Sequence, residues 1–252
     1  GMTRPIRESC RTVLRRELSG QQLTRPEDYA QLEAAGISQI SEWGIHILGY
    51  WAQAGLLCIG PHQGKQPTMV LLDDWVPLEA SRDLSRDEAL HTLALRYFAG
   101  HGPATLHDWA WWSGLPISEA RRALEMSAAQ LQSFELDGKT YWMPLESPAQ
   151  PATVINAHLL PPYDEYMVAF KDRSAALDGE DLRESRYGIF GPNLLVNGKI
   201  IGAWQRKVKK SEMHIELMPT RQLLDVERAA LEGAAERYAR FFGLNAVTSL
   251  PN

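Results

Sequence analysis

The order of three helices followed by a β-hairpin is predicted twice within the first 145 residues of the sequence. In residues 4–78, Thr24 and Pro26 are typical of a helix start, and Gly36 and Gly55 are typical of helix ends. Two short apolar runs follow, separated by a polar loop that contains Gly and Pro. The predicted elements are helices over residues 4–18, 24–35 and 39–54 and strands over residues 56–60 and 68–72.

The second copy of this order, in residues 84–145, has the clearer turn signal. Gly100, Gly102 and Gly114 interrupt the helical pattern, and Thr105 is a typical cap for the helix between them. Asp137-Gly138 between two short β-rich runs is a strong hairpin signal. The predicted elements are helices over residues 86–99, 105–111 and about 116–129, and strands over residues 133–136 and 140–143.

The remainder of the chain follows a different plan. Prolines and small residues over 146–153 predict a linker, and Asn197-Gly198 predicts a tight hairpin. Residues 225–242 have the apolar spacing of a long amphipathic helix. The other predicted elements are a strand over 157–160, a helix or irregular element over 163–170, a hairpin over 194–208 and a half-buried strand over 213–217.

These patterns predict an α+β fold, with tandem winged-helix units followed by a small antiparallel sheet that packs on a C-terminal helix. The predicted domains are residues 2–80 and 84–146, each a winged-helix unit, and residues 154–252, the sheet and its helix.

Composition narrows the class of protein. The 8 Trp, 8 Tyr and 6 Phe exclude disorder across the whole chain. No apolar run approaches the roughly 18 residues of a membrane span, and no signal peptide is recognisable. We expect Cys10 and Cys58 to be reduced, as in a cytoplasmic protein. The scattered His residues lack metal-ligand spacing and no nucleotide-binding motif occurs, so we expect no metal and no cofactor.

The net charge of −5 means that a nucleic-acid-binding chain of this kind must gather its cations on one face. In a winged helix the third helix enters the major groove and the hairpin contacts phosphates. This geometry assigns Arg121 and Arg122 to the groove, Lys139 to the tip of the second hairpin, and Lys65 to the first hairpin. Further basic residues are Arg4, Arg7, Arg11 and Arg15 near the N-terminus, and Arg206, Lys207, Lys209 and Lys210. The alternative is that these residues form ordinary solvated surface.

An unusual stretch follows the diproline Pro161-Pro162. Tyr163, Asp164, Glu165 and Tyr166 follow it in order, and the run Lys171-Asp172-Arg173-Ser174 lies a few residues further on. Two carboxylates, two tyrosines and a nearby Arg can form a site in which one carboxylate orients a water molecule. Equally, Asp164 can cap a helix and Arg173 can pair with an acid, and the sequence leaves both interpretations open.

Four segments resemble the bacterial winged-helix DNA-binding family that includes the AlkZ-type DNA glycosylases. The longest runs from Tyr97 to Leu115 and contains His-Gly-Pro-Ala-Thr and Trp-Trp-Ser-Gly-Leu. The others are residues 55–61, residues 160–166 with Asp172-Arg173-Ser174, and residues 196–204. As a set these segments cover about residues 40–245 and are specific to the family.

The resemblance implies tandem winged helices around a concave surface that binds double-stranded DNA. It also implies that enzymatic members excise alkylated bases, including those in interstrand crosslinks, with a Gln-x-Gln or Gln-x-Asp motif in an N-terminal region. We expect this chain to begin after that region. Gln130-Leu131-Gln132 lies elsewhere in the predicted fold and carries little weight.

Three hypotheses follow. The first is a DNA-binding module of this family without its catalytic segment, which contacts phosphates through Arg121, Arg122, Lys139, Arg173 and the Arg206–Lys210 run. The second is an active glycosylase in which Asp164 or Glu165 orients the attacking water. The third is a transcriptional regulator or protein-interaction module built from winged helices. None of the three requires a membrane.

Overall fold

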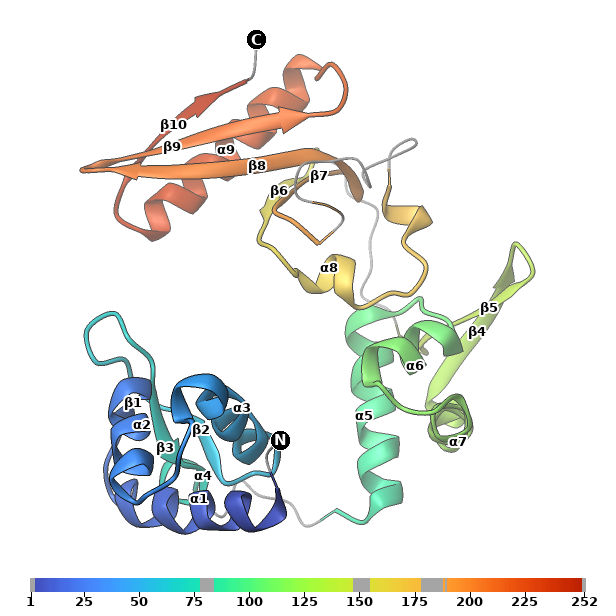
Figure 1. The fold of residues 1–252 in the computed structure, drawn as a ribbon. Helices are drawn as coiled ribbons and strands as arrows, with labels where there is room; N and C mark the ends of the chain where they lie inside the picture. Colours follow the sequence, from blue (N-terminus) through green and yellow to red (C-terminus); the bar gives the residue numbers. More distant parts are fainter. Residues whose placement is uncertain (1–2, 78–83, 147–154, 178–187, 189, 251–252) are drawn as a thin grey trace. The chain divides into compact units, whose positions relative to one another are not determined.

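The computed structural model describes residues 3–77, 84–146, 155–177, 188 and 190–250. The chain divides into two compact units, residues 1–83 and residues 84–252 (Figure 1). Mixed helices and small sheets confirm the α+β class. The second and third predicted domains both fall within the second unit, and the three-part division remains a prediction.

The first unit contains the predicted helices and hairpin. Its helices are α1 (Arg4–Glu17), α2 (Arg25–Ala34) and α3 (Ile40–Gln53), and the hairpin strands are β2 (Leu57–Ile59) and β3 (Thr68–Leu71). Two short elements were not predicted, β1 (Leu23–Thr24) and α4 (Leu72–Trp75). A strand of two residues has no periodicity of its own, and β1 exists because it pairs antiparallel with β3.

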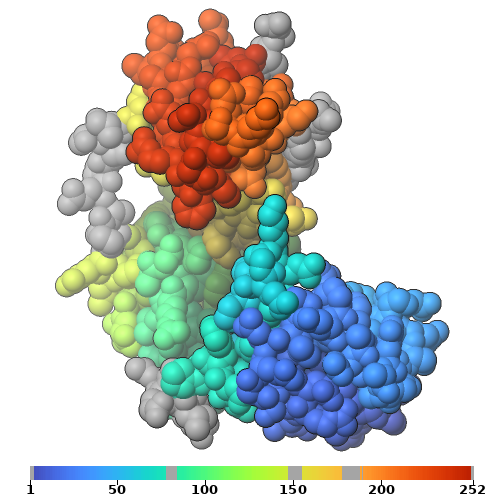
Figure 2. Space-filling view, turned by 90° about the vertical axis from the view of Figure 1, so that its left-hand side faces the viewer, coloured from blue at the N-terminus to red at the C-terminus, as the bar shows by residue number. Residues whose placement is uncertain are grey.

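One apolar core holds the first unit together. Its fully buried side chains come from all three long helices, from the residue after α1 and from β2, and they are Cys10, Leu14, Leu18, Leu32, Ile40, Ile47, Leu48 and Leu57. The loop between β2 and β3 projects from this body, as the cyan segment shows (Figures 1 and 2). The predicted wing of the first unit is therefore an exposed loop.

The second unit begins with the predicted helices α5 (Arg86–His101), α6 (Leu106–Ser113) and α7 (Ile117–Ser127). A short 3-10 turn, Ala128–Gln130, leads into the hairpin strands β4 (Leu131–Leu136) and β5 (Lys139–Pro144). Asp137 and Gly138 have φ values of 51° and 70°, as a type I′ turn requires. The buried core of these elements includes Tyr97, Phe98, Trp109, Leu124 and Leu131.

A mixed sheet with helices beside it forms the rest of the described second unit. Its order is β10-β9-β8-β7-β6, and its strands are β6 (Ala157–Leu160), β7 (Asn193–Val196), β8 (Lys199–Lys209), β9 (Glu212–Pro219) and β10 (Asn245–Ser249). The prediction of a purely antiparallel sheet is wrong, because β10 pairs parallel to β9. The helix α9 (Asp225–Phe241) connects these two strands, and such a crossover brings the next strand back in the same direction.

Helix α9 packs on this sheet and buries its apolar residues against Leu194, Trp204, Ile215 and Leu217. Among the described residues between β6 and β7, the chain forms one helical turn, α8 (Glu165–Val168), and a short 3-10 turn, Ser174–Ala176. Residues 147–154, most of the predicted linker, lie outside the described residues. No helix in the described residues has the length and apolar character needed to cross a membrane.

Candidate nucleic-acid interface

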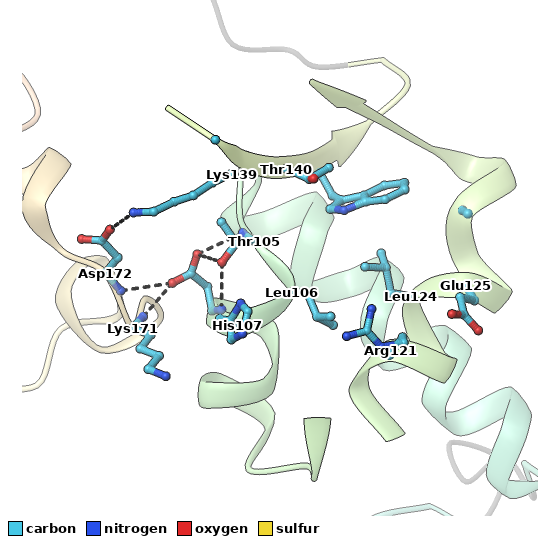
Figure 3. Close-up of a pocket in the computed structure, with 14 residues that line it drawn as sticks. Thr105, Leu106, His107, Arg121, Leu124, Glu125, Lys139, Thr140, Lys171 and Asp172 are labelled. Carbon is cyan, nitrogen blue, oxygen red and sulfur yellow. Dashed lines mark hydrogen bonds and ion pairs between the residues drawn. The ribbon is translucent and has the colours of Figure 1, made fainter. Parts of the chain in front are cut away.

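A hollow of about 840 Å³ opens on the surface of the second unit (Figure 3). Four segments surround it: the start of α6, one face of α7, the hairpin β4–β5, and the loop after α8. Its lining includes Thr105, His107, Asp108, Arg121, Glu125, Lys139, Thr140, Trp142, Lys171 and Asp172. The hollow therefore joins the predicted third helix and hairpin to a loop whose Lys171 lies 63 residues after Asp108 of α6.

Asp108 fixes the floor of the hollow. One carboxylate oxygen accepts hydrogen bonds from the backbone N–H of Thr105 at 3.0 Å and its hydroxyl at 2.6 Å, which closes the N-terminus of α6. The other oxygen accepts from the backbone N–H groups of Lys171 at 2.8 Å and Asp172 at 3.2 Å. The carboxylate is buried and all of these bonds are charge-assisted, so it ties the loop after α8 to α6.

The hairpin is tied to the same loop by an ion pair. Lys139 Nζ lies 2.5 Å from an Asp172 carboxylate oxygen. This contact lowers the pKa of Asp172, helped by the hydroxyl and backbone N–H of Ser174, and raises the pKa of Lys139. Both side chains are about half exposed, so the pair remains open to competition from other ions.

Two further cationic side chains line the hollow and have no carboxylate partner among the described residues. Arg121 projects from α7 and Lys171 from the loop after α8 (Figure 3). Both are exposed, and neither forms a salt bridge with any residue that the structure describes. Together with Lys139 they bring three positive charges from three segments to one surface.

The structure places the other predicted contacts of the second unit elsewhere. Arg122 donates to both carboxylate oxygens of Asp87 at 2.6 Å and does not line the hollow. Arg173 donates from Nε to the Met167 carbonyl at 2.5 Å, and its guanidinium lies over the rings of Trp111 and Phe190. Both guanidinium groups are thus engaged within the protein.

The two candidate carboxylates have different surroundings. Asp164 caps α8, because its side chain accepts from the backbone N–H of Tyr166 at 2.9 Å. Glu165 accepts from the indole N–H of Trp112 at 3.1 Å and lies 3.3 Å from Nε2 of His101. Glu165 is exposed and therefore accessible to a ligand, whereas Asp164 has the structural role that the sequence left open.

The remaining basic residues lie on three other surfaces. Arg206 on β8 lies over the rings of Tyr238 and Phe242, at 5.3 and 4.9 Å from their centroids. Lys207, Lys209 and Lys210 follow at the exposed end of the β8–β9 hairpin, and Lys65 is exposed in the β2–β3 loop. Near the N-terminus, Arg7, Arg11 and Arg15 are engaged by Tyr50, Trp51 and Asp73.

The sequence patterns did not assign His107, Thr105 or Thr140 to a site. The run Lys171-Asp172-Arg173-Ser174 pointed to this loop, but no spacing along the chain indicates that it meets α6. Gln132, in the Gln-x-Gln triplet, donates to the carbonyls of Pro144 and Leu145. Among the described residues, no group of three or more His, Cys, Asp or Glu side chains is placed to hold a metal ion.

The fold is that of a known DNA glycosylase. The solved structure of the Streptomyces sahachiroi DNA glycosylase AlkZ superposes with a TM-score of 0.74 at 23% sequence identity. The match covers 98% of this chain and 68% of that chain. Comparison with curated protein sequences gives no significant match.

A family model agrees with this likeness of fold. The model described as "DNA glycosylase AlkZ-like" matches residues 5–241, which reaches further toward the N-terminus than the four motif segments do. The match takes in α1 to α9, and hence both units of the structure. The chain belongs to the AlkZ-like DNA glycosylase family.

Proposed function

We propose that the second unit binds double-stranded DNA through the surface around the hollow, with α5 to α7 and the β4–β5 hairpin acting as a winged helix. The observation that carries this proposal is the convergence of Arg121, Lys139 and Lys171 on one hollow from three separate segments. Three carboxylates also line the hollow, but Asp108 is buried and bound by backbone N–H groups, and Asp172 is paired with Lys139. The unpaired charges that face a ligand are those of Arg121 and Lys171 against that of Glu125, which favours a polyanion in a chain of net charge −5.

The geometry suits a duplex. In a winged helix the third helix reaches into the major groove while the hairpin contacts the backbone. Arg121 on α7 would then contact the groove or its rim, and Lys139 and Lys171 would contact phosphates. Lys139 keeps two N–H donors free of its bond to Asp172, because an ammonium group has three. The basic end of the β8–β9 hairpin is a second candidate contact.

Fluorescence anisotropy with a labelled 20-base-pair duplex at several salt concentrations tests this proposal. We expect Arg121→Ala and Lys171→Ala each to weaken binding several-fold and to reduce the salt slope by about 1. Arg122→Ala is the matched control, since Arg122 is a neighbouring arginine on α7 that pairs with Asp87. Absence of salt-dependent binding, or an equal loss in the control variant, would contradict the assignment and favour an interaction module.

Base excision is the second candidate function, favoured by membership of the glycosylase family and by the pairing of Glu165 with His101. A carboxylate there can accept the proton of a water molecule that attacks the sugar C1′ as the base departs with the bonding electrons. We expect Glu165→Gln to abolish release of a methylated base from duplex DNA and Asp164→Asn to retain it. Release that survives Glu165→Gln unchanged would remove Glu165 from the reaction.

A further inference from the structure

A pair of stacked rings in the second unit has no part in the interface described above. The ring of Tyr163 stacks on the ring of Phe190, with a centroid distance of 6.0 Å and an interplanar angle of 11°. Tyr163 is nevertheless 75% exposed. Since only one flank of the ring is covered by Phe190, a large aromatic surface faces solvent.

The backbone holds Tyr163 in this position at a cost. Its φ of 59° lies in the left-handed region, which residues other than Gly, Asn and Asp seldom adopt. The preceding Pro161-Pro162 restricts the chain, and the Tyr163 N–H donates to the Phe190 carbonyl at 2.9 Å. Strain of this kind at an exposed aromatic residue is typical of functional positions.

Positive charge lies beside the stacked pair. The guanidinium of Arg173 lies 4.9 Å from the Phe190 ring centroid and 5.3 Å from that of Trp111. Arg173 directly follows Lys171 and Asp172, which line the hollow. The carboxylates that follow Tyr163 in the sequence, Asp164 and Glu165, accept hydrogen bonds from within the protein. The surroundings of the rings therefore suit an electron-rich, planar ligand attached to a phosphate backbone.

We propose that Tyr163 and Phe190 form a stacking platform for an unpaired nucleobase of the DNA bound at the hollow. This inference rests on the proposed DNA binding and adds to it the place where an unpaired base of the bound DNA would lie. Every nucleobase has a π face that stacks on an aromatic ring, whereas a folded protein partner would need a continuous apolar patch. The platform would accept a base that is bulged, mismatched or turned out of the helix.

The test compares two duplexes that are identical except for one bulged nucleotide. We expect the wild-type chain to bind the bulged duplex at least about fivefold more tightly than the fully paired one, the lower end of the effect of one base–aromatic stack. Tyr163→Phe keeps this ratio because it keeps the ring. Tyr163→Leu brings the ratio to about one, at the same backbone strain. Tyr50→Leu, which alters an exposed tyrosine of the first unit, keeps the wild-type ratio.

A second measurement needs no variant. With 5-iodouracil as the bulged base, irradiation of the wild-type complex should attach the DNA to the peptide that contains Tyr163. Three results would overturn the platform without affecting the proposed binding of the paired duplex. They are a wild-type ratio of bulged to paired affinity near one, the same ratio in Tyr163→Leu as in the wild type, and crosslinks only to peptides that lack Tyr163. A different outcome would overturn the proposed function and keep the platform. In it, the chain does not bind the fully paired duplex, but it binds the bulged duplex and loses that binding in Tyr163→Leu.

Discussion

Helices α2 and α6 have similar N-termini, but the buried aspartate near each N-terminus has different hydrogen-bond partners. Each follows a threonine whose backbone N–H and hydroxyl donate to an acidic side chain three residues on, Glu27 in α2 and Asp108 in α6. In α2 the next residue, Asp28, is fully buried, and neither of its oxygens has a hydrogen-bond partner among the residues that the structure describes. Asp108 is equally buried but has two further donors.

The difference arises from distant parts of the chain. The loop after α8 brings the N–H groups of Lys171 and Asp172 to Asp108, whereas no described residue brings a donor to Asp28. Burial, reinforced by the charge of Glu27, accordingly raises the pKa of Asp28 to about 7. A buried carboxylate thus stabilises one unit and weakens the other at neutral pH, depending on its tertiary donors.

The largest effect expected is that of Asp108→Ala. It removes a buried, charge-assisted set of bonds and leaves the Lys171 and Asp172 N–H groups unsatisfied, so we expect a loss of about 3–5 kcal/mol in the free energy of unfolding. Urea denaturation measures it. Glu27→Ala is the matched control, since it removes only a capping interaction, and it should lose clearly less. Equal losses would mean that the distant donors contribute nothing.

Asp28→Asn should act in the opposite direction. The folded-state pKa of Asp28 lies above its unfolded value near 3.8, so its contribution is fully favourable below pH 4 and is lost as the pH rises to about 7. We expect the variant to be about 4 kcal/mol more stable than the wild type at pH 8 and nearly equal to it at pH 4, by urea denaturation. A gain that is independent of pH would exclude titration of Asp28 as the cause.

Asp172→Asn tests how the loop after α8 restrains the hairpin. The amide keeps an acceptor for Ser174 but no longer holds the Lys139 ammonium as an ion pair. We expect affinity for paired duplex DNA to rise about two- to fivefold, because the surface gains one net positive charge. Asp87→Asn changes the net charge equally at a pair outside the hollow. An equal rise in both variants would indicate a general charge effect.

The smallest effect expected is that of Lys65→Ala in the first unit. Its third helix, α3, has no Arg or Lys, and its arginines near the N-terminus are engaged by Tyr50, Trp51 and Asp73. We therefore expect less than about a twofold loss of duplex affinity, against the several-fold loss for Lys171→Ala. Anisotropy titrations of both variants in one buffer compare them. A larger loss for Lys65→Ala would assign the main contact to the first unit.

The sequence by itself determined the elements whose signals are local. Apolar spacing, capping residues and Asp137-Gly138 predicted α1 to α3, α5 to α7 and the β4–β5 hairpin close to their observed bounds. Such signals report contacts between residues a few positions apart, and helices and tight turns are formed by those contacts. The motif segments also indicated the family, because runs of identical residue types can be recognised along the chain alone.

Only the tertiary structure decided which distant groups meet. In the folded chain β10 pairs parallel to β9, and the backbone N–H groups of Lys171 and Asp172 donate to Asp108. Arg173 donates to the Met167 carbonyl, and Asp28 has no donor among the described residues. Each of these outcomes depends on a donor, acceptor or strand supplied from another element, and one sequence carries no periodic trace of such a contact. The residue types at the site could thus be read from the chain, but their partners could not.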